Sequence, residues 1–344
     1  MTQAGDWVVV GLDNGGTKNN ATVLDAFGRF LVGELVETPS RVTEGPDVAL
    51  GALEGAFAGA LQRTGITRAR VKAVGLDTPG PASATGVISS KGSTNFEHPG
   101  WRSFDFRGAL EARLGLPVLY NNDGNAAALY AHHRLFGPEA AERASISAII
   151  GTGFGGGVIE KGQVIKGAAG FAGELGHVHI PLHGLLEPDQ PLPSCNCGFV
   201  GDAESIASLT GIENNLLPYW LSKHPGHELA RAGSMAAAAK RVRGLAERGD
   251  PLALAIFEQQ AKAVGRLFTI AANFTDPDAY FLGGGVVEAA PRFREWFLGK
   301  VRENTALKEE QVKASRLEVV PDLDMAGARG AAIAVLEALR AGRT

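Results

Sequence analysis

The sequence predicts an α/β protein built from two similar domains, and two observations carry this prediction. One pattern, a strand followed by a glycine-rich turn and a β-hairpin, occurs at the start of the chain and again after residue 145. In addition, a chain of 344 residues exceeds the size at which one hydrophobic core keeps growing. Two copies of one α/β unit suggest two domains that face a cleft, and clefts between domains are preferred places for ligands.

The first copy begins with the apolar run WVVVGL at 7–12, which we expect to be a buried strand. The turn DNGGTK follows, and the stretches ATVLD and RFLVGEL are expected to run extended on either side of the turn AFG. The remaining elements of this half are predicted as a helix at about 46–63, a strand at 71–76, a helix at 107–114 and a strand at 117–120.

The second copy begins with the strand ISAII at 146–150 and continues with GTGFGG, GVIE and QVIKG. Two long helical stretches, at 230–248 and 251–273, precede a strand at 280–285 that ends in GGG. The stretch 326–341 is also helical in its pattern.

We place the domain boundary after residue 121. Residues 1–121 then form an N-terminal α/β domain, against which the C-terminal helix, about 326–344, is expected to pack. Residues 122–325 form a larger C-terminal α/β domain.

Composition narrows the class of protein. The formal net charge is −4 and the sequence has no basic block, which argues against a dedicated nucleic-acid surface. No apolar run approaches the ~20 residues that span a bilayer. The start, MTQAGDW, lacks the pattern of a secretory signal, and the chain has only two cysteines. We therefore expect a cytoplasmic protein.

The turn DNGGTK is a candidate for phosphate binding. It places Asp13 at a strand end and Gly15 and Gly16 in the turn, where backbone N–H groups can approach phosphate oxygens. Thr17 adds a hydroxyl donor and Lys18 a positive charge. Asp13 stands where a carboxylate could hold Mg²⁺ through water beside a triphosphate. A plain hairpin turn explains this stretch equally well.

Two further glycine clusters bear on nucleotide binding. GTGFGGG at 151–157 matches neither the P-loop pattern nor a well-placed dinucleotide fingerprint. Two phosphate-type turns at equivalent places in a duplicated fold are nevertheless a stronger signal than either alone. LGGGVVE at 282–288 lies between a strand and a helix, where it could receive adenosine or simply allow close packing of the two elements.

Adjacent polar side chains follow the strand at 117–120. Asn122 and Asp123 stand at the start of a helix that continues from Gly124, and adjacent Asn and Asp can hold neighbouring hydroxyls of one ring. A carboxylate there could also accept the proton of an attacking hydroxyl. The alternative is that Asp123 only caps the helix.

The only two cysteines, Cys195 and Cys197, lie in CNCGFVGDAE. Their spacing is too tight for an ordinary disulfide. Two thiolates could contribute to a metal site, but structural zinc usually has four ligands. If this is a metal site, two ligands must come from elsewhere in the chain.

Together these motifs resemble the ROK family. DNGGT, TPGP (78–81), NNDGNAAA, GTGFGGG, GELGH (173–177), CNCGFVGDAE and LGGGVVE occur in the family's order over nearly the whole chain. The combination of GELGH with C-x-C-G-x-x-G is highly specific. The family contains bacterial sugar kinases, N-acetylhexosamine kinases and sugar-responsive repressors. The repressors carry a helix-turn-helix before the first strand, and only six residues precede Trp7 here, so we do not expect that role.

The resemblance implies a fold and roles for individual residues. The fold would be a two-domain actin-like or hexokinase-like ATPase fold with duplicated βββαβαβα units around a cleft. Asp123 matches the family's catalytic base. The implied sugar-binding residues are Gly80, Asn95, Asn122, Asp123, Glu174, His177 and Glu204. The implied nucleotide-binding residues are Asp13, Gly15, Gly16, Thr17, Lys18, Gly151, Thr152, Gly153 and Gly284, with ATP and Mg²⁺ as cofactors.

The cysteine stretch departs from the family's pattern. Members read C-x-C-G-x-x-G-C-x-E, whereas Asp202 stands here in place of the third cysteine. An Asp oxygen also binds zinc. The resemblance therefore implies a structural Zn²⁺ with the ligands His177, Cys195, Cys197 and Asp202. His179 and His183 are possible substitutes, and loss of the metal is the alternative.

We therefore expect an ATP-dependent hexokinase or glucokinase that converts glucose to glucose 6-phosphate. Within the class, the alternatives are kinases for N-acetylmannosamine, N-acetylglucosamine, mannose, fructose or allose. A non-catalytic sugar sensor and an actin-like filament or chaperone ATPase are alternatives from other classes. Polyphosphate stays open as a donor, and the resemblance implies a homodimer.

Overall fold

The structure, a computed structural model, describes residues 6–34, 36–80, 82–90 and 96–342. The chain divides into two compact units. The first comprises Met1–Ala141, Gly157–Ala172 and Pro321–Thr344, and the second comprises Glu142–Gly156 and Gly173–Val320. The first unit thus continues past residue 121, because helix α3 (Asp123–Phe136) packs against helix α11 (Leu323–Arg340).

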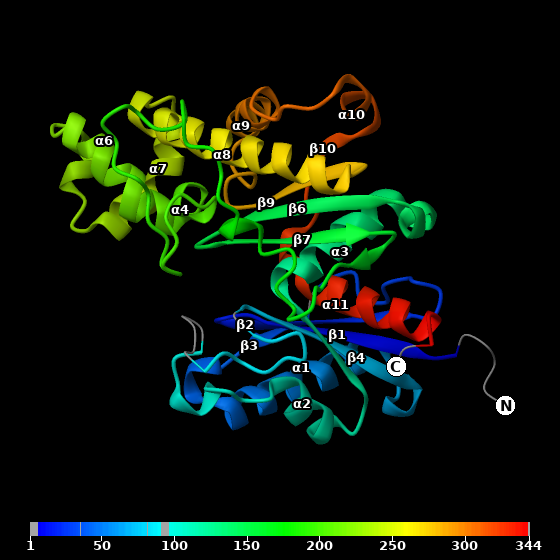
Figure 1. The fold of residues 1–344 in the computed structure, drawn as a ribbon. Helices are drawn as coiled ribbons and strands as arrows, with labels where there is room; N and C mark the ends of the chain where they lie inside the picture. Colours follow the sequence, from blue (N-terminus) through cyan, green and yellow to red (C-terminus); the bar gives the residue numbers. More distant parts are fainter. Residues whose placement is uncertain (1–5, 35, 81, 91–95, 343–344) are drawn as a thin grey trace. The chain divides into compact units, whose positions relative to one another are not determined.

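The first unit contains a five-stranded sheet of order β3-β2-β1-β4-β5 (Figure 1). Its strands are β1 (Val8–Asn14), β2 (Lys18–Asp25), β3 (Val36–Pro39), β4 (Val71–Thr78) and β5 (Val118–Asn122). β1 pairs antiparallel with β2, whereas β1 with β4 and β4 with β5 are parallel pairs. The carboxyl ends of β1, β4 and β5 therefore lie at the same edge of the sheet.

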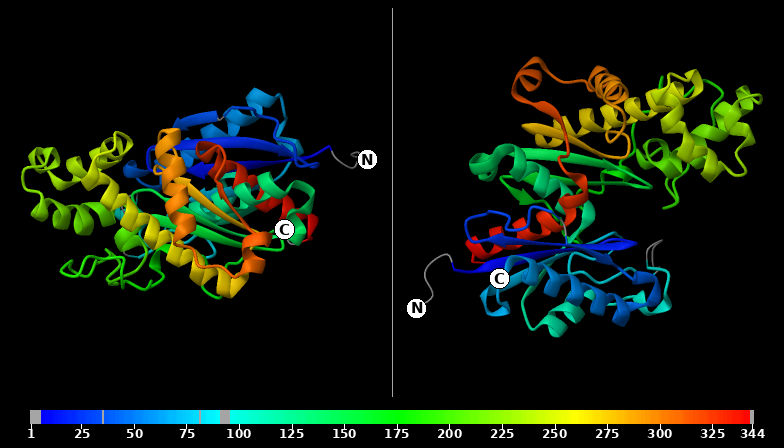
Figure 2. Two further views of the ribbon diagram at one scale, coloured as in Figure 1. Left: turned by 90° about the horizontal axis from the view of Figure 1, so that it is seen from above. Right: turned by 180° about the vertical axis from the view of Figure 1, so that it is seen from behind.

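Helices cover both faces of this sheet, as Figures 1 and 2 show. On one face lie α1 (Pro46–Thr64) and α2 (Phe106–Leu114), which share the apolar core with strand residues such as Val10 and Leu12. On the other face lies α11, whose backbone contacts the strands closely. A Cβ at Gly11 would lie 1.9 Å from the Ala328 carbonyl oxygen, so only glycine fits there.

The second sheet has the order β10-β9-β6-β7-β8. Its strands are β6 (Ala144–Ile150), β7 (Phe154–Glu160), β8 (Gln163–Val164), β9 (Ala279–Gly284) and β10 (Arg316–Val319). Read from the hairpin, β8-β7-β6-β9-β10 repeats the order β3-β2-β1-β4-β5 of the first sheet. The predicted duplication and the α/β fold class are confirmed.

The second unit is rich in helices. They are α4 (Glu204–Ala207), α5 (Leu209–Gly211), α6 (Leu217–Lys223), α7 (Met235–Glu247), α8 (Pro251–Thr275), α9 (Pro291–Glu303) and α10 (Glu309–Ala314). Within the described residues no helix, the 25-residue α8 included, combines the length and apolar character that crossing a membrane requires.

One predicted strand was wrong. RFLVGEL was expected to pair as the second arm of a hairpin, but the strand that pairs with β2 is β3, at Val36–Pro39. The turn predicted at AFG does form, and in it the Asp25 carboxylate accepts hydrogen bonds from the backbone N–H groups of Phe27 and Arg29. After the turn the chain returns to β2 only briefly: Asp25 N–H donates to the Arg29 carbonyl oxygen, Leu31 N–H donates to the Val23 carbonyl oxygen, and the bridge between Phe30 and Leu24 stays isolated.

The helix predicted at 230–248 begins later, at Met235. Ser234 is its N-cap, and the Ser234 hydroxyl accepts a hydrogen bond from the backbone N–H of Ala237. A serine that caps in this way fixes the first turn of a helix. The preceding residues Glu228–Arg231 form a separate 3-10 turn.

Candidate active site

The first group of polar side chains lies at the carboxyl ends of the strands of the first sheet. In the strand register Asp13 stands beside Asn20 of β2 and beside Asp77 of β4, and Asp77 stands beside Asn121 of β5. Neighbours in register point to the same face of a sheet. Asn20 Nδ2 donates to Asp13 Oδ2 at 2.9 Å. The strand register thus brings Asp13 to a second carboxylate, Asp77, that was not predicted as a site residue.

Glycine in α11 leaves room for these two carboxylates. A Cβ at Gly327 would lie 2.8 Å from Asp77 Oδ2 and 2.9 Å from Asp13 Cγ. Any larger residue would therefore collide with both side chains. Asp13 and Asp77 share one small volume between the sheet and α11.

Burial and mutual repulsion disfavour the charged forms of these carboxyls. Burial raises the pKa of Asp13 to about 6, the hydrogen bond from Asn20 lowers it, and the charge of Asp123 raises it further. Burial also raises the pKa of Asp77 well above its usual range, with added contributions from the charges of Asp13 and Asp123. Asp13, Asp77 and Asp123 are thus close enough to influence one another's ionisation.

Asp123 occupies the first position of α3 and does not cap it. The N-cap is Asn122, whose Oδ1 accepts a hydrogen bond from the backbone N–H of Asn125 at 2.8 Å. The alternative in which Asp123 only caps the helix is therefore wrong. Asp123 Oδ1 accepts the backbone N–H of Gly124 at 2.7 Å, and the residue is exposed. A solvent-accessible carboxylate at a helix N-terminus can meet a substrate hydroxyl.

A small hollow in the first unit lies beside Asn122. It is lined by Ala82, Ser83, Ala84, Tyr120, Asn121, Asn122, Asn125, Lys166 and Gly170. Lys166 Nζ donates to the Tyr120 carbonyl oxygen at 3.0 Å. Gly80 is exposed and precedes this segment, whereas the predicted sugar contact Asn95 lies outside the described residues.

The predicted phosphate turn of the first unit joins β1 to β2. Gly15 N–H donates to the Lys18 carbonyl oxygen at 2.9 Å, which closes the turn. Neither Gly15 nor Gly16 has a positive φ. Lys18 Nζ pairs with Glu37 at 2.8 Å, and both side chains are half exposed. Left-handed geometry is therefore not the reason for glycine in this turn, whereas a Cβ at Gly15 would lie 3.0 Å from the Lys18 carbonyl oxygen.

The second predicted phosphate turn, Gly151–Gly153, is held by its own unit. Thr210 donates to the Thr152 carbonyl oxygen from both its N–H and its hydroxyl, the latter at 2.8 Å. Glu204 Oε2 accepts the backbone N–H of Phe154 at 2.7 Å. This link between Glu204 and the turn spans fifty residues and was not predicted.

Gly284 is explained by packing. Its φ is +95°, and a Cβ there would lie 1.9 Å from the Ile150 carbonyl oxygen of β6. Close approach of β9 to β6 is therefore sufficient reason for this glycine. The predicted contact of Gly284 with adenosine stays a prediction.

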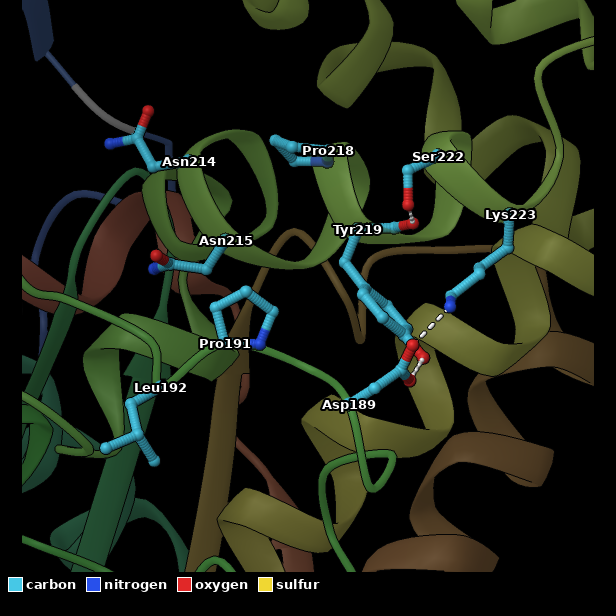
Figure 3. A pocket seen from close by; sticks show the side chains of 9 residues that line it. All are labelled: Asp189, Pro191, Leu192, Asn214, Asn215, Pro218, Tyr219, Ser222 and Lys223. Atoms are coloured by element: carbon cyan, nitrogen blue, oxygen red, sulfur yellow. Dashed lines mark hydrogen bonds and ion pairs between the residues drawn. The ribbon is translucent and has the colours of Figure 1, made fainter.

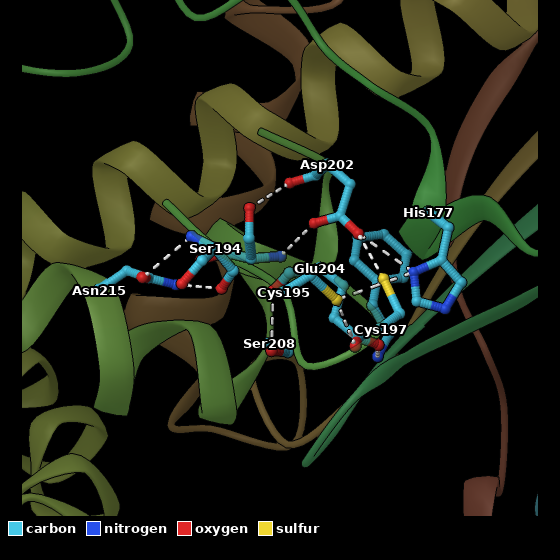
Figure 4. A network of polar contacts seen from close by, with 10 residues as sticks. His177, Ser194, Cys195, Cys197, Asp202, Glu204, Ser208 and Asn215 are labelled. Atoms are coloured by element: carbon cyan, nitrogen blue, oxygen red, sulfur yellow. Dashed lines mark hydrogen bonds and ion pairs between the residues drawn. The ribbon is translucent and has the colours of Figure 1, made fainter. Parts of the chain in front are cut away.

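Four predicted metal ligands come together in the second unit (Figure 4). One ligand atom from each of His177, Cys195, Cys197 and Asp202 lies within 4.8 Å of the other three. His177 Nδ1 lies 3.1 Å from Asp202 Oδ2 and 3.9 Å from Cys195 Sγ, and Cys197 Sγ lies 3.8 Å from Asp202 Oδ2. Neither His179 nor His183, the possible substitutes, belongs to this cluster of described residues.

The three pair distances, 3.1, 3.9 and 3.8 Å, are near those around a tetrahedral ion. Ligands bound at about 2.0–2.3 Å from a tetrahedral zinc stand roughly 3.3–3.8 Å apart. Asp202 is fully buried, and its Oδ1 accepts the backbone N–H of Ser205 at 2.9 Å, so its second oxygen is held toward His177. The donor set of imidazole, two thiols and a carboxylate suits zinc.

Without a metal the cluster is held by hydrogen bonds. The bond to Asp202 raises the pKa of His177 to about 9, although burial opposes it. Burial raises the pKa of the Cys195 thiol. Zinc binding must therefore displace protons from both residues.

Glu174 lies near the same cluster. It precedes the 3-10 turn Leu175–His177. Burial raises its pKa, the charge of His177 lowers it, and the charge of Glu204 raises it. Glu174, His177 and Glu204 therefore lie close enough to interact electrostatically.

A separate hollow of about 390 Å³ in the second unit does not involve the predicted site residues (Figure 3). It is lined by Asp189, Pro191, Leu192, Asn214, Asn215, Pro218, Tyr219, Ser222 and Lys223. Tyr219 donates to Asp189 Oδ1 at 2.7 Å. Asn215 hydrogen-bonds to both the N–H and the carbonyl oxygen of Ser194, which steadies the chain next to Cys195.

Two five-stranded sheets of one strand order, each led by a strand, a glycine turn and a hairpin, define the actin-like ATPase fold. Solved structures agree. The chain is 32% identical to a ROK hexokinase from Thermus thermophilus, with a TM-score of 0.75 over 97% of this chain and 99% of that one. A ROK family glucokinase from Streptomyces griseus, solved with glucose and AMPPNP, gives 28% identity and a TM-score of 0.67 over 95% and 98%.

The chain belongs to the ROK family, whose sequence profile matches residues 9–338. Among curated relatives, it is 29% identical over 311 residues to a glucokinase of Streptomyces coelicolor, covering 85% of this chain and 89% of the relative. It is 31% identical over 284 residues to an N-acetyl-D-glucosamine kinase of Citrobacter koseri, covering 80% and 83%.

Proposed function

We propose that this protein is an ATP-dependent glucokinase, which transfers the γ-phosphate of ATP to glucose and forms glucose 6-phosphate. The observation that carries the proposal is that Asp123 is an exposed carboxylate at the start of α3. It is not needed to cap this helix, because Asn122 is the N-cap. The relationship to glucokinases supports the same activity.

In this mechanism Asp123 is the general base. Its carboxylate accepts the proton of the attacking sugar hydroxyl as that oxygen forms a bond to the γ-phosphorus and the bond to the β-γ bridging oxygen breaks. Asn122 lies next to Asp123 and would hold a neighbouring hydroxyl. Glu174, His177 and Glu204 are the proposed sugar-binding residues of the second unit, and Gly80 and Asn95 those of the first.

The nucleotide phosphates would bind at the two glycine turns. In the first unit the phosphates would meet the Gly15–Gly16 turn, with Thr17 and Lys18 beside it. In the second unit Gly151–Gly153 offers the equivalent turn, which Glu204 and Thr210 hold in place. Asp13 would hold Mg²⁺, which neutralises charge on the phosphates.

Substrate choice is tested by one experiment. A coupled assay that measures ADP release is run with glucose, mannose, fructose, allose and the two N-acetylhexosamines. We expect the largest kcat/KM with glucose. A larger kcat/KM with N-acetylglucosamine would favour the second candidate, which rests on the relatives that are N-acetylglucosamine kinases. ATP turnover that ignores every sugar would contradict a sugar kinase altogether.

We also propose that the His177 cluster binds one zinc per chain as a structural ion that steadies the segment carrying His177 and Glu204. An Asp oxygen is a harder ligand than a thiolate. Asp202→Cys should therefore hold zinc more tightly than the wild type, and metal removal should raise the KM for sugar more than the KM for ATP. Zinc release to a chromogenic chelator and steady-state kinetics measure these effects.

The control for an added thiol is Asp189→Cys, which changes an exposed Asp of the same unit outside the cluster. It should leave zinc release unchanged. Elemental analysis of protein purified without chelators measures the number of zinc ions per chain directly. Fully active protein with less than about a tenth of an equivalent of zinc would show that the cluster is not a metal site.

A homodimer is the proposed assembly, from the family resemblance alone. Sedimentation equilibrium measures it, and a single species of 35.9 kDa would contradict it.

A further inference from the structure

Four polar side chains form one row across the first sheet. In strand order they are Asn20 on β2, Asp13 on β1, Asp77 on β4 and Asn121 on β5, and each stands in register with the next. Residues in register across neighbouring strands share a face, and here it is the face that α11 covers. The apolar residues Val10 and Leu12 belong to the core on the opposite face.

Two members of this row are buried without a hydrogen-bond partner. Asp77 is 0% exposed, and neither of its carboxylate oxygens makes a hydrogen bond. Asn121 is 3% exposed, and its side-chain oxygen and nitrogen are also unpartnered. Buried polar groups are nearly always satisfied, and a buried carboxylate without a partner is especially costly. The row therefore requires a partner for Asp77 that is not one of the described side chains.

The position of Asp77 indicates what that partner is. Asp77 Oδ2 and Asp13 Cγ both lie within 3 Å of the place where a Gly327 side chain would begin. One oxygen of Asp13 is occupied by Asn20, which leaves the other available. Two carboxylates that meet in one volume, with the unpartnered Asn121 amide in register on the next strand, offer the hard oxygen ligands that Mg²⁺ prefers.

We propose that Asp13 and Asp77 together bind one divalent cation, Mg²⁺ in the active enzyme, with the Asn121 amide oxygen as an additional ligand, and that this site fills before the nucleotide binds. The inference rests on the proposed role of Asp13 toward magnesium and adds Asp77 and Asn121 to it. A resident cation would cancel the repulsion between the two carboxylates and present a positive charge beside the Gly15–Gly16 turn.

Mn²⁺ is a suitable probe because it takes the same oxygen ligands and its free form is measured by electron paramagnetic resonance. Nucleotide-free wild-type protein, pretreated with chelator, is titrated with Mn²⁺ and then with competing Mg²⁺. We expect one Mn²⁺ that Mg²⁺ displaces. Asp77→Asn should weaken this binding by at least about ten-fold, as loss of a ligand does. No Mg²⁺-displaceable Mn²⁺ in the wild type, or equal affinity in Asp77→Asn, would overturn the proposal.

The matched control is Asp47→Asn, which removes a fully exposed carboxylate of the same unit and should leave Mn²⁺ affinity unchanged. A second variant, Asn121→Ala, should also weaken Mn²⁺ binding, so the test does not depend on the folding of one mutant. Thermal unfolding gives an independent readout. Mg²⁺ alone should raise the Tm of the wild type and of Asp47→Asn but not that of Asp77→Asn, and an equal rise in all three would contradict the site.

These outcomes separate the cation site from the kinase function. Mn²⁺ binding without nucleotide tests the site alone, whereas glucose-dependent ADP release by the wild type tests the function alone. Displaceable Mn²⁺ with no sugar-dependent turnover would support the cation site and contradict the kinase function. Sugar-dependent turnover in a protein that binds no Mn²⁺ in the absence of nucleotide would support the kinase function and contradict the cation site.

Discussion

Asp123→Asn is expected to slow phosphoryl transfer by roughly 10²–10⁴-fold, the usual contribution of a positioned general base, while sugar binding is retained. The amide cannot accept the hydroxyl proton, yet it keeps the size of the carboxylate. The substitution should not disturb α3, because Asn122 caps that helix and Asp123 is exposed.

Two measurements check this result. Steady-state kinetics give kcat, and calorimetric titration with glucose gives the affinity of the variant. Its circular dichroism should match that of the wild type. If folded Asp123→Asn protein keeps more than half of the wild-type kcat, Asp123 is not the general base.

Gly16→Val is expected to abolish nucleotide use with a much smaller effect on sugar affinity. A β-branched side chain would fill the space in which phosphate oxygens approach the backbone of the turn. Backbone strain is not the reason, because Gly16 does not have a positive φ. Calorimetry with a non-hydrolysable ATP analogue, and separately with glucose, measures the two affinities.

Gly33→Val is the matched control for this change. Gly33 belongs to the same unit, has no positive φ, and has open space where its Cβ would stand. It should leave nucleotide affinity unchanged. If Gly16→Val folds and binds the nucleotide as the wild type does, DNGGTK is only a hairpin turn.

Much of the fold was predictable because its signals are local. The apolar runs before DNGGTK and GTGFGGG are strong strand patterns, and both became the central strands β1 and β6 of equivalent sheets. The incorrect strand at RFLVGEL shows the limit of such patterns. Its alternation is suitable for a strand and the predicted turn at AFG does form, but the chain pairs with β2 only from Arg29 to Leu31, and the strand partner of β2 is β3.

The parts of the site that were missed depend on long-range register. Asp77 belongs to DTPGP and follows a predicted strand, but its proximity to Asp13 depends on the parallel pairing of β1 with β4. The bond from Phe154 to Glu204 likewise joins residues fifty positions apart. By contrast, Cys195, Cys197 and Asp202 lie within one short stretch, and only His177 had to be added from outside it.

The central claim is that this protein uses ATP to phosphorylate glucose, and ADP release by the purified wild type with and without glucose tests it most directly. The account predicts that ADP release depends on glucose, that glucose 6-phosphate forms in equal amount, and that Asp123→Asn removes nearly all of both. ADP release at the same rate without sugar, or no release with any hexose or amino sugar in the presence of Mg²⁺, would contradict it.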